Sequence, residues 1–100
     1  MTALEQEFDD AVMQAVRDGE KLNYSASVFL DMRHRYGTVE TSRRLINSAQ
    51  VPYGFAKLQH LNRLNLTIEA IIHDNPKFQA LFSQKTLDNC DARLAAVGYI

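Results

Sequence analysis

The sequence predicts an all-α protein that folds as a single compact domain of six or seven short helices. Apolar side chains recur along most of the chain with the period of a helix, about 3.6 residues. Only four Gly and two Pro are present among 100 residues, which is few for an all-β protein with many tight turns. The apolar fraction of 46% indicates a chain that can form one hydrophobic core and argues against disorder. The predicted domain spans residues 1–100.

The first helix is predicted over residues 2–17. Its apolar side chains form one stripe at helical spacing, and most of its acidic side chains lie off that stripe. Gly19 follows and suits the left-handed conformation in which many helices end. We interpret residues 1–20 as an acidic N-terminal helix and residues 25–100 as the helical core. The stripe consists of Leu4, Phe8, Ala11, Val12, Ala15 and Val16.

Two further helices are predicted on either side of Gly37. The first begins at Ser25 and is closed by Gly37, and Thr38 is expected to cap the second. Glu40 then lies in the first turn, where the helix dipole favours negative charge. The second of these helices is expected to stop at Asn47. The expected buried side chains of the pair are Val28, Phe29, Met32, Tyr36, Val39, Leu45 and Ile46.

Pro52 and Thr67 mark the starts of the next two helices. Pro52 suits the first helical position, and Thr67 suits an N-cap. Leu66 and Ile71 flank that cap at the spacing of a hydrophobic staple. The isoleucine-rich stretch 66–72 would also suit a buried strand, but no other segment could pair with it, so a central helix is favoured. The helix after Pro52 repeats apolar residues every three positions, namely Phe55, Leu58, Leu61 and Leu64.

The chain is predicted to close with a short helix from Pro76 and a longer one capped by Ser83. Gly98 fits the position after that helix, and Tyr99 could then contact Leu94 as in a Schellman motif. Phe78, Leu81 and Phe82 are expected to be buried on the short helix. The inner face of the last one is expected to carry Leu87, Cys90, Leu94 and Val97.

Charge is distributed unevenly in a chain whose net charge is only −1. Residues 1–20 carry six acids against one base, a formal charge of −5. Residues 33–63 carry six bases against one acid, a formal charge of +5. The acidic head lies outside the region that carries a family resemblance described below, so we expect it to be a separable addition that shields or complements the basic middle.

No motif for catalysis, metal binding or phosphate binding is present. Glu69 and His73 are four residues apart, which predicts a polar pair at the rim of a helix rather than a di-iron site. Asp9 and Asp10 are adjacent and predict a solvated face rather than an acid/base pair. Folding 100 residues around one core also leaves little room for a deep cleft. We therefore expect a protein that is not an enzyme, with no cofactor, no metal and no small-molecule substrate.

The single cysteine, Cys90, and the absence of long apolar runs indicate where in the cell the protein is located. A single cysteine cannot form an internal disulfide, and Cys90 is expected to be a small buried side chain. No stretch approaches the roughly 18 apolar residues of a membrane span, and no signal peptide is recognisable. A cytoplasmic protein without membrane contact is expected.

The basic middle has two functional readings beside a purely structural one. Two short helices that carry Arg43, Arg44, Lys57 and Arg63 are compatible with helix-turn-helix nucleic-acid binding. Against this, the connector 47–52 is longer than the usual turn, and the domain lacks a net basic charge. In the structural reading, the charges are solvated or packed beside the acidic helix and contribute roughly 0–1 kcal/mol each.

Binding of a protein partner, or of a second copy of this chain, is the reading we favour from the sequence. Arg and Tyr are enriched at interface hot spots, and a basic face attracts acidic partners. The residues predicted to bind the partner are Arg33, Arg35, Arg43, Arg44, Tyr53, Lys57 and Arg63.

Several short motifs resemble a small all-helical bacterial family to which no activity is assigned. The chain matches its Gly-Thr-Val at 37–39, Arg-Arg-Leu-Ile at 43–46 and Tyr-Gly-Phe at 53–55. Leu-Thr-Ile-Glu-Ala at 66–70 and Leu-Phe at 81–82 match as well, before a closing Ala-Val-Gly-Tyr. The resemblance covers about two-thirds of the chain and leaves out the acidic head. It implies a single helical domain that serves as an accessory module of bacterial or mobile-element proteins.

Overall fold

Six α-helices and two short 3-10 helices make up the protein, and no strand is present. The computed structural model describes all 100 residues. The prediction of an all-α, compact single domain is confirmed. In chain order the elements are α1 (Ala3–Glu20), α2 (Ser27–Tyr36), α3 (Thr38–Ile46), α4 (Tyr53–His60), η1 (Leu64–Leu66), α5 (Ile68–Asp74), η2 (Pro76–Leu81) and α6 (Gln84–Ala96).

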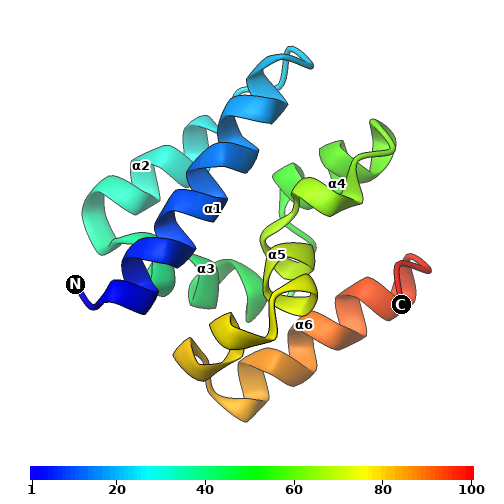
Figure 1. Ribbon diagram of the computed structural model, residues 1–100. Helices are drawn as coiled ribbons and strands as arrows, with labels where there is room; N and C mark the ends of the chain where they lie inside the picture. The colour runs from blue at the N-terminus through cyan, green and yellow to red at the C-terminus, as the bar shows by residue number, and fades with distance from the viewer.

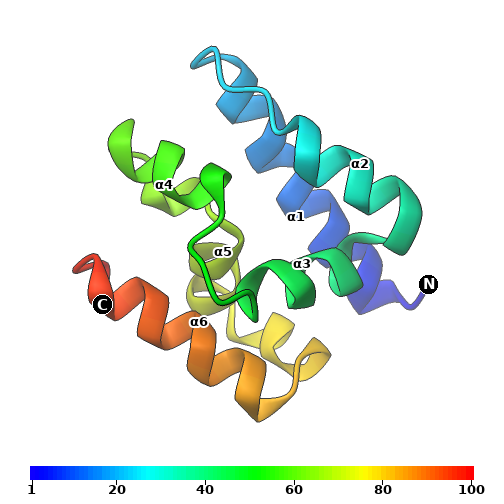
Figure 2. The ribbon, with the colours of Figure 1, turned by 180° about the vertical axis from the view of Figure 1, so that it is seen from behind.

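The helices form two arms that diverge from a common base. Helices α1 and α2 lie side by side in one arm, and α4 stands apart from them in the other (Figures 1 and 2). Helix α5 lies between the arms and packs against α6, and α3 packs against α1, α2 and α6. This arrangement places α4 at the edge of the molecule, where its main neighbour is η1.

The N-terminal helix is part of the hydrophobic core. The ring of Phe8 is completely buried and packs edge-on against Phe78 and Phe82, with centroid distances of 5.2 and 5.5 Å. Val12 and Val16 on the same stripe are buried as well. The expectation that the acidic head is a separable addition is therefore wrong, because its apolar stripe covers η2 and α5.

Helix α1 continues past the residue that was expected to end it. Gly19 lies inside the helix, which ends at Glu20, and the left-handed residue is Asn23, with φ of 61°. Gly19 has a different structural role: a Cβ at this position would lie 3.2 Å from Cδ2 of Tyr24, a tight contact that glycine avoids. The glycine therefore permits the Tyr24 ring to pack against the end of α1.

Gly37 is the only residue between α2 and α3. With φ of 81°, it ends α2 through a bond from its N–H to the carbonyl of Arg33, and it also serves as the N-cap of α3. Thr38 is the first residue of α3 and not its cap, because its hydroxyl is bonded to the Asp9 carboxylate. Val28 was expected to be buried but is 69% exposed.

The caps of the C-terminal half are confirmed. The Thr67 hydroxyl accepts a bond from the N–H of Ala70, and that of Ser83 accepts one from Thr86. Gly98 adopts φ of 75°, and the N–H of Tyr99 donates to the carbonyl of Leu94 at 2.9 Å, as a Schellman motif requires. Pro52 differs slightly: it is the N-cap of α4 and not its first residue.

None of these helices combines the length and the apolarity that crossing a membrane requires.

Candidate binding surface and cavity

Arg33, one of the predicted binding residues, is bound inside the molecule. Its Nε and Nη2 donate to the two carboxylate oxygens of Asp9, each at 2.8 Å, and Nε also reaches the Thr38 hydroxyl. Asp9 is buried, so the expectation that Asp9 and Asp10 form a solvated face is correct only for Asp10. The pair joins α1 to the α2–α3 corner.

From the ion pair of Asp9 and Arg33 we expect the stability of the fold to depend on pH. The Arg33 guanidinium holds the pKa of Asp9 below its ordinary value of 3.8. A carboxyl group with a lowered pKa in the folded state stabilises the fold above its unfolded pKa, and the contribution is lost as pH falls through the folded pKa. We expect the free energy of unfolding of the wild type to fall more steeply from about pH 5 to pH 2 than that of Asp9→Asn. Urea denaturation at each pH measures this.

Asp10→Asn is the matched control, since Asp10 is exposed on the same helix and bonded only to Gln6. Its pH profile should follow the wild type. Equal slopes for the wild type and Asp9→Asn would show that Asp9 has the same pKa in both states.

Arg43 and Arg44 share one acidic partner. Both contact Glu40 on α3, with N–O distances of 2.6 and 2.8 Å, and the two guanidinium groups lower the pKa of Glu40 to about 2. Arg44 also stacks on the ring of Tyr36, 3.8 Å from its centroid. The local charge of this cluster is therefore smaller than the Arg43-Arg44 sequence implies.

The other residues predicted to bind a partner are basic side chains without an acidic partner and one exposed tyrosine. Neither Lys57 on α4 nor Arg63 after it forms an ion pair, and Tyr53 at the start of α4 is 73% exposed. Arg35 is also exposed and unpaired, but it lies at the far end of α2. Tyr53 and Lys57 thus lie on α4 and Arg63 shortly after it, whereas Arg33, Arg35, Arg43 and Arg44 lie on α2 and α3.

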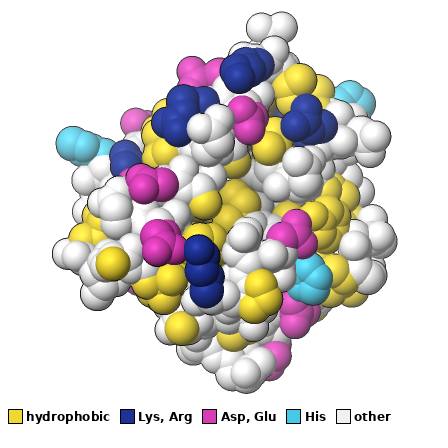
Figure 3. Space-filling model, viewed as in Figure 1, with side chains coloured by type: hydrophobic (Ala, Val, Ile, Leu, Met, Phe, Trp, Pro, Cys, Tyr) yellow, Lys and Arg dark blue, Asp and Glu magenta, His cyan; other side chains and the backbone are white.

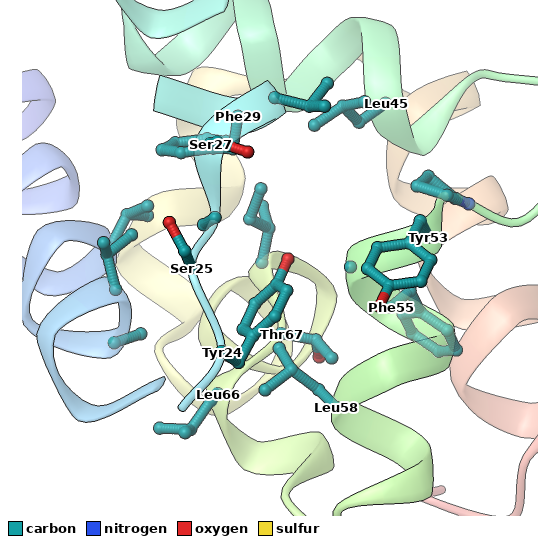
Figure 4. Close-up of a pocket in the computed structure, with 18 of the residues that line it drawn as sticks. Tyr24, Ser25, Ser27, Phe29, Leu45, Tyr53, Phe55, Leu58, Leu66 and Thr67 are labelled. Atoms are coloured by element: carbon teal, nitrogen blue, oxygen red, sulfur yellow. The ribbon is translucent and has the colours of Figure 1, made fainter. Parts of the chain in front are cut away.

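A cavity that the sequence did not predict lies between the two arms. Its volume is about 350 Å³, and 13 of its 19 lining residues are hydrophobic. Figure 3 shows hydrophobic atoms in the hollow between the arms, and Figure 4 shows the Tyr24 ring standing across from Tyr53. Gly54 leaves room for Tyr24, because a Cβ there would lie 2.5 Å from the Tyr24 hydroxyl oxygen. We call this cavity the inter-arm cavity.

Glu69 lies on the wall of the inter-arm cavity and is bound to Arg93. It is only 4% exposed, and its Oε2 accepts a bond of 2.9 Å from Nη1 of Arg93. Burial raises the pKa of Glu69 against the opposing effect of Arg93. The predicted rim pair of Glu69 and His73 is therefore wrong: His73 instead lies 3.9 Å from Asp91.

Arg93 also joins distant parts of the backbone. Its Nη1 donates to the carbonyl of Leu45 at 3.0 Å, and its Nη2 to the carbonyl of Ser48 at 3.2 Å. The guanidinium carbon lies 5.9 Å from the centroid of the Phe55 ring. This one side chain therefore holds the end of α3, the connector to α4 and the buried carboxylate of α5.

Cys90 is a buried, free thiol. This burial is as predicted, and it raises the pKa of Cys90 to about 12, so the unreactive thiol form prevails at neutral pH. No group of three His, Cys, Asp or Glu side chains is arranged to hold a metal ion.

No protein-family model, curated protein or solved structure matches this chain.

Proposed function

We propose that this protein is a non-enzymatic interaction module that binds an acidic protein partner through Tyr53, Lys57 and Arg63. The observation that carries this proposal is which basic side chains have an acidic partner within the molecule and which do not. Arg33 and Arg93 are bound to buried carboxylates, and Arg43 and Arg44 share Glu40. Lys57 and Arg63 have no such partner, so their charge is available to another molecule.

The sequence around α4 strengthens the positive potential of this surface. No Asp or Glu occurs between residues 41 and 68. Tyr53 and Lys57 are four residues apart and share one side of α4, and Arg63 follows directly after the helix. Tyr and Arg are common interface anchors, and an uncompensated basic surface speeds association with an acidic partner.

The same proposal accommodates the resemblance to a helical bacterial family. Tyr53 belongs to the Tyr-Gly-Phe motif that carries the resemblance, and an accessory module of a larger bacterial system is expected to act by binding. Arg33 then acts inside the molecule through its pair with Asp9, whereas Arg43 and Arg44 stay exposed on α3 and share the charge of Glu40.

Reversing the charge of Lys57 and Arg63 is expected to abolish partner binding while the helix content stays unchanged. The double variant Lys57→Glu with Arg63→Glu places two acids where an acidic partner would bind, and like charges repel. Affinity capture from nuclease-treated native lysate, followed by mass spectrometry, compares the proteins retained by each variant, and circular dichroism checks the fold.

Arg35→Glu with Lys85→Glu is the matched control. Both residues are exposed and unpaired, and they lie at the ends of α2 and α6 away from α4 (Figure 1). The control changes the net charge by the same amount and should retain the partner. Identical proteins captured by both double variants would overturn the proposal, and loss in both would make the binding nonspecific.

Two other kinds of partner, nucleic acid and a second copy of this chain, can be distinguished by experiment. A helix-turn-helix reader needs two helices that pack together, whereas α3 packs against α1, α2 and α6 and α4 packs against η1. Retention of nucleic acid in an untreated lysate, with an affinity that falls steeply as salt rises, would favour nucleic acid instead. A sedimentation coefficient that increases with protein concentration would identify a second copy of this chain as the partner.

A further inference from the structure

The mouth of the inter-arm cavity carries apolar side chains that are exposed to solvent on both arms. Val28 near the start of α2 and Tyr53 at the start of α4 both line the cavity, and their exposed fractions are 69% and 73%. Val51, just before α4, is exposed as well. In Figure 4, Tyr53 stands on one side of the space and Ser25, which leads into α2, on the other. Exposed apolar side chains around an apolar hollow are typical of a surface that another molecule covers.

The space behind this mouth suits apolar side chains of a partner. Its volume of about 350 Å³ lies near the lower end of the range of small ligand pockets, and Phe29, Phe55 and Leu58 form buried parts of its wall. Glu69 is the only charged residue of the lining, and its carboxylate is bonded to Arg93. The cavity therefore accepts a few apolar side chains, and the charged groups of a partner stay outside it.

The two arms beside the cavity differ in charge. Residues 1–36, which include α1 and α2, carry seven acids against four bases, whereas residues 51–63 carry two bases, Lys57 and Arg63, and no acid. A partner that approaches the cavity is therefore attracted at α4 if its acidic side chains lie on that side, and the same acids would be repelled at α1. This favours a partner with acids along one flank of an apolar stripe.

A segment that enters this groove must bring its own backbone hydrogen bonds. The protein has no strand, so no sheet edge is available to pair with an extended peptide. Backbone N–H and C=O groups that are buried against apolar side chains without partners are costly. A helix pairs these groups internally and presents apolar side chains at positions i, i+3, i+4 and i+7 on one face.

From these observations we propose that the acidic partner binds through an amphipathic helix whose apolar side chains enter the inter-arm cavity. The apolar stripe of that helix is seated between Val28 and Tyr53, and its acidic side chains face Lys57 and Arg63. This inference rests on the proposed function, because it takes the partner to be acidic. It adds the cavity and the second arm to the binding surface.

A designed peptide tests the inference without the natural partner. The peptide has about 16 residues and is held helical by a lactam bridge, because short helices are marginal in water. It carries a fluorescein label, Leu at positions i, i+3, i+4 and i+7, and Glu on one flank. Two control peptides replace the Leu residues by Ala or the Glu residues by Lys. Fluorescence anisotropy is expected to show saturable binding of the first peptide and about tenfold weaker binding, or less, of each control.

Val28→Gln separates the cavity from the basic side chains, because Val28 lies on the arm opposite Lys57 and Arg63. We expect it to weaken binding of the acidic peptide about fivefold or more. Ala15→Leu, which fills part of the cavity, should weaken binding about tenfold. Ile100→Gln is the matched control, since Ile100 is an exposed apolar residue that does not line the cavity, and it should bind as the wild type does. Circular dichroism checks that each variant keeps its helix content.

The outcomes distinguish this inference from the proposed function. An absence of saturable binding up to the solubility of the acidic peptide would overturn the inference. Equal affinity of the wild type, Val28→Gln and Ala15→Leu, together with loss of binding in Lys57→Glu with Arg63→Glu, would remove the cavity from the binding site and leave the proposed function standing. Unchanged binding by Lys57→Glu with Arg63→Glu would overturn the proposed function together with the acidic flank of the helix.

Discussion

Arg93→Met is expected to lower the free energy of unfolding by about 3–5 kcal/mol, as removal of one partner from a buried ion pair commonly does. The Arg93 side chain is only 10% exposed and that of Glu69 only 6%, so the remaining carboxylate would be left in an apolar wall without its cation. The carbonyls of Leu45 and Ser48 would lose their donor as well. Urea denaturation followed by circular dichroism measures the loss.

The double variant Glu69→Leu with Arg93→Met tests whether stability depends on the charges of the ion pair or only on the space that the two side chains fill. Replacing both members of a buried pair by apolar residues is often neutral or better, so the double variant should recover much of the stability lost in Arg93→Met. Wild-type stability of Arg93→Met would mean that water reaches Glu69 and that the pair is not truly buried.

Phe8→Ala is expected to cost about 3–5 kcal/mol, the usual cost of removing a large ring from a core. Phe8 is fully buried, and its ring forms T-shaped pairs with those of Phe78 and Phe82. For a domain of this size the loss corresponds to a fall in Tm of well over about 10 °C, which calorimetry can measure.

Val28→Ala is the corresponding control, because Val28 is an apolar residue in a helix but is mostly exposed. Its Tm should stay close to that of the wild type. If Phe8→Ala behaved like Val28→Ala, the N-terminal helix would contribute little to the core, and the original expectation of a separable acidic head would return.

Local features of the fold could be predicted from the sequence, since their causes lie within a few residues. The caps at Thr67 and Ser83 and the motif at Gly98 depend on short-range hydrogen bonds, and all three were identified. Gly19 was misread because glycine serves two purposes: it tolerates left-handed backbone, and it permits close contact. Only the position of Tyr24 in space distinguishes between them.

The pairing of charges was predictable only where partners are close in sequence. Glu40 lies three and four residues before Arg43 and Arg44, a spacing that brings side chains together on a helix. Asp9 and Arg33 are 24 residues apart, as are Glu69 and Arg93, and no spacing rule joins them. Counting charges therefore overstated the basic surface, because Arg33 is bound to Asp9, and Arg43 and Arg44 share Glu40.

The inter-arm cavity left almost no signal in the sequence. Its lining is drawn from five separate segments of the chain, and each apolar residue in it also reads as part of the core. Gly54 within the motif Tyr-Gly-Phe is the one available sign, since a glycine at a helix start often permits close approach. What it approaches, the hydroxyl of Tyr24, depends on how the two arms are placed.

The bonds from Arg93 to the backbone bear on the order in which the chain acquires its structure. They join residues that are 48 and 45 positions apart, so these two bonds form only after α6 has docked against the end of α3. During synthesis, all of the chain through α5 is made before Arg93 is available. We therefore expect the connector, and with it the setting of α4 against the rest of the molecule, to be the last part of the protein to become ordered.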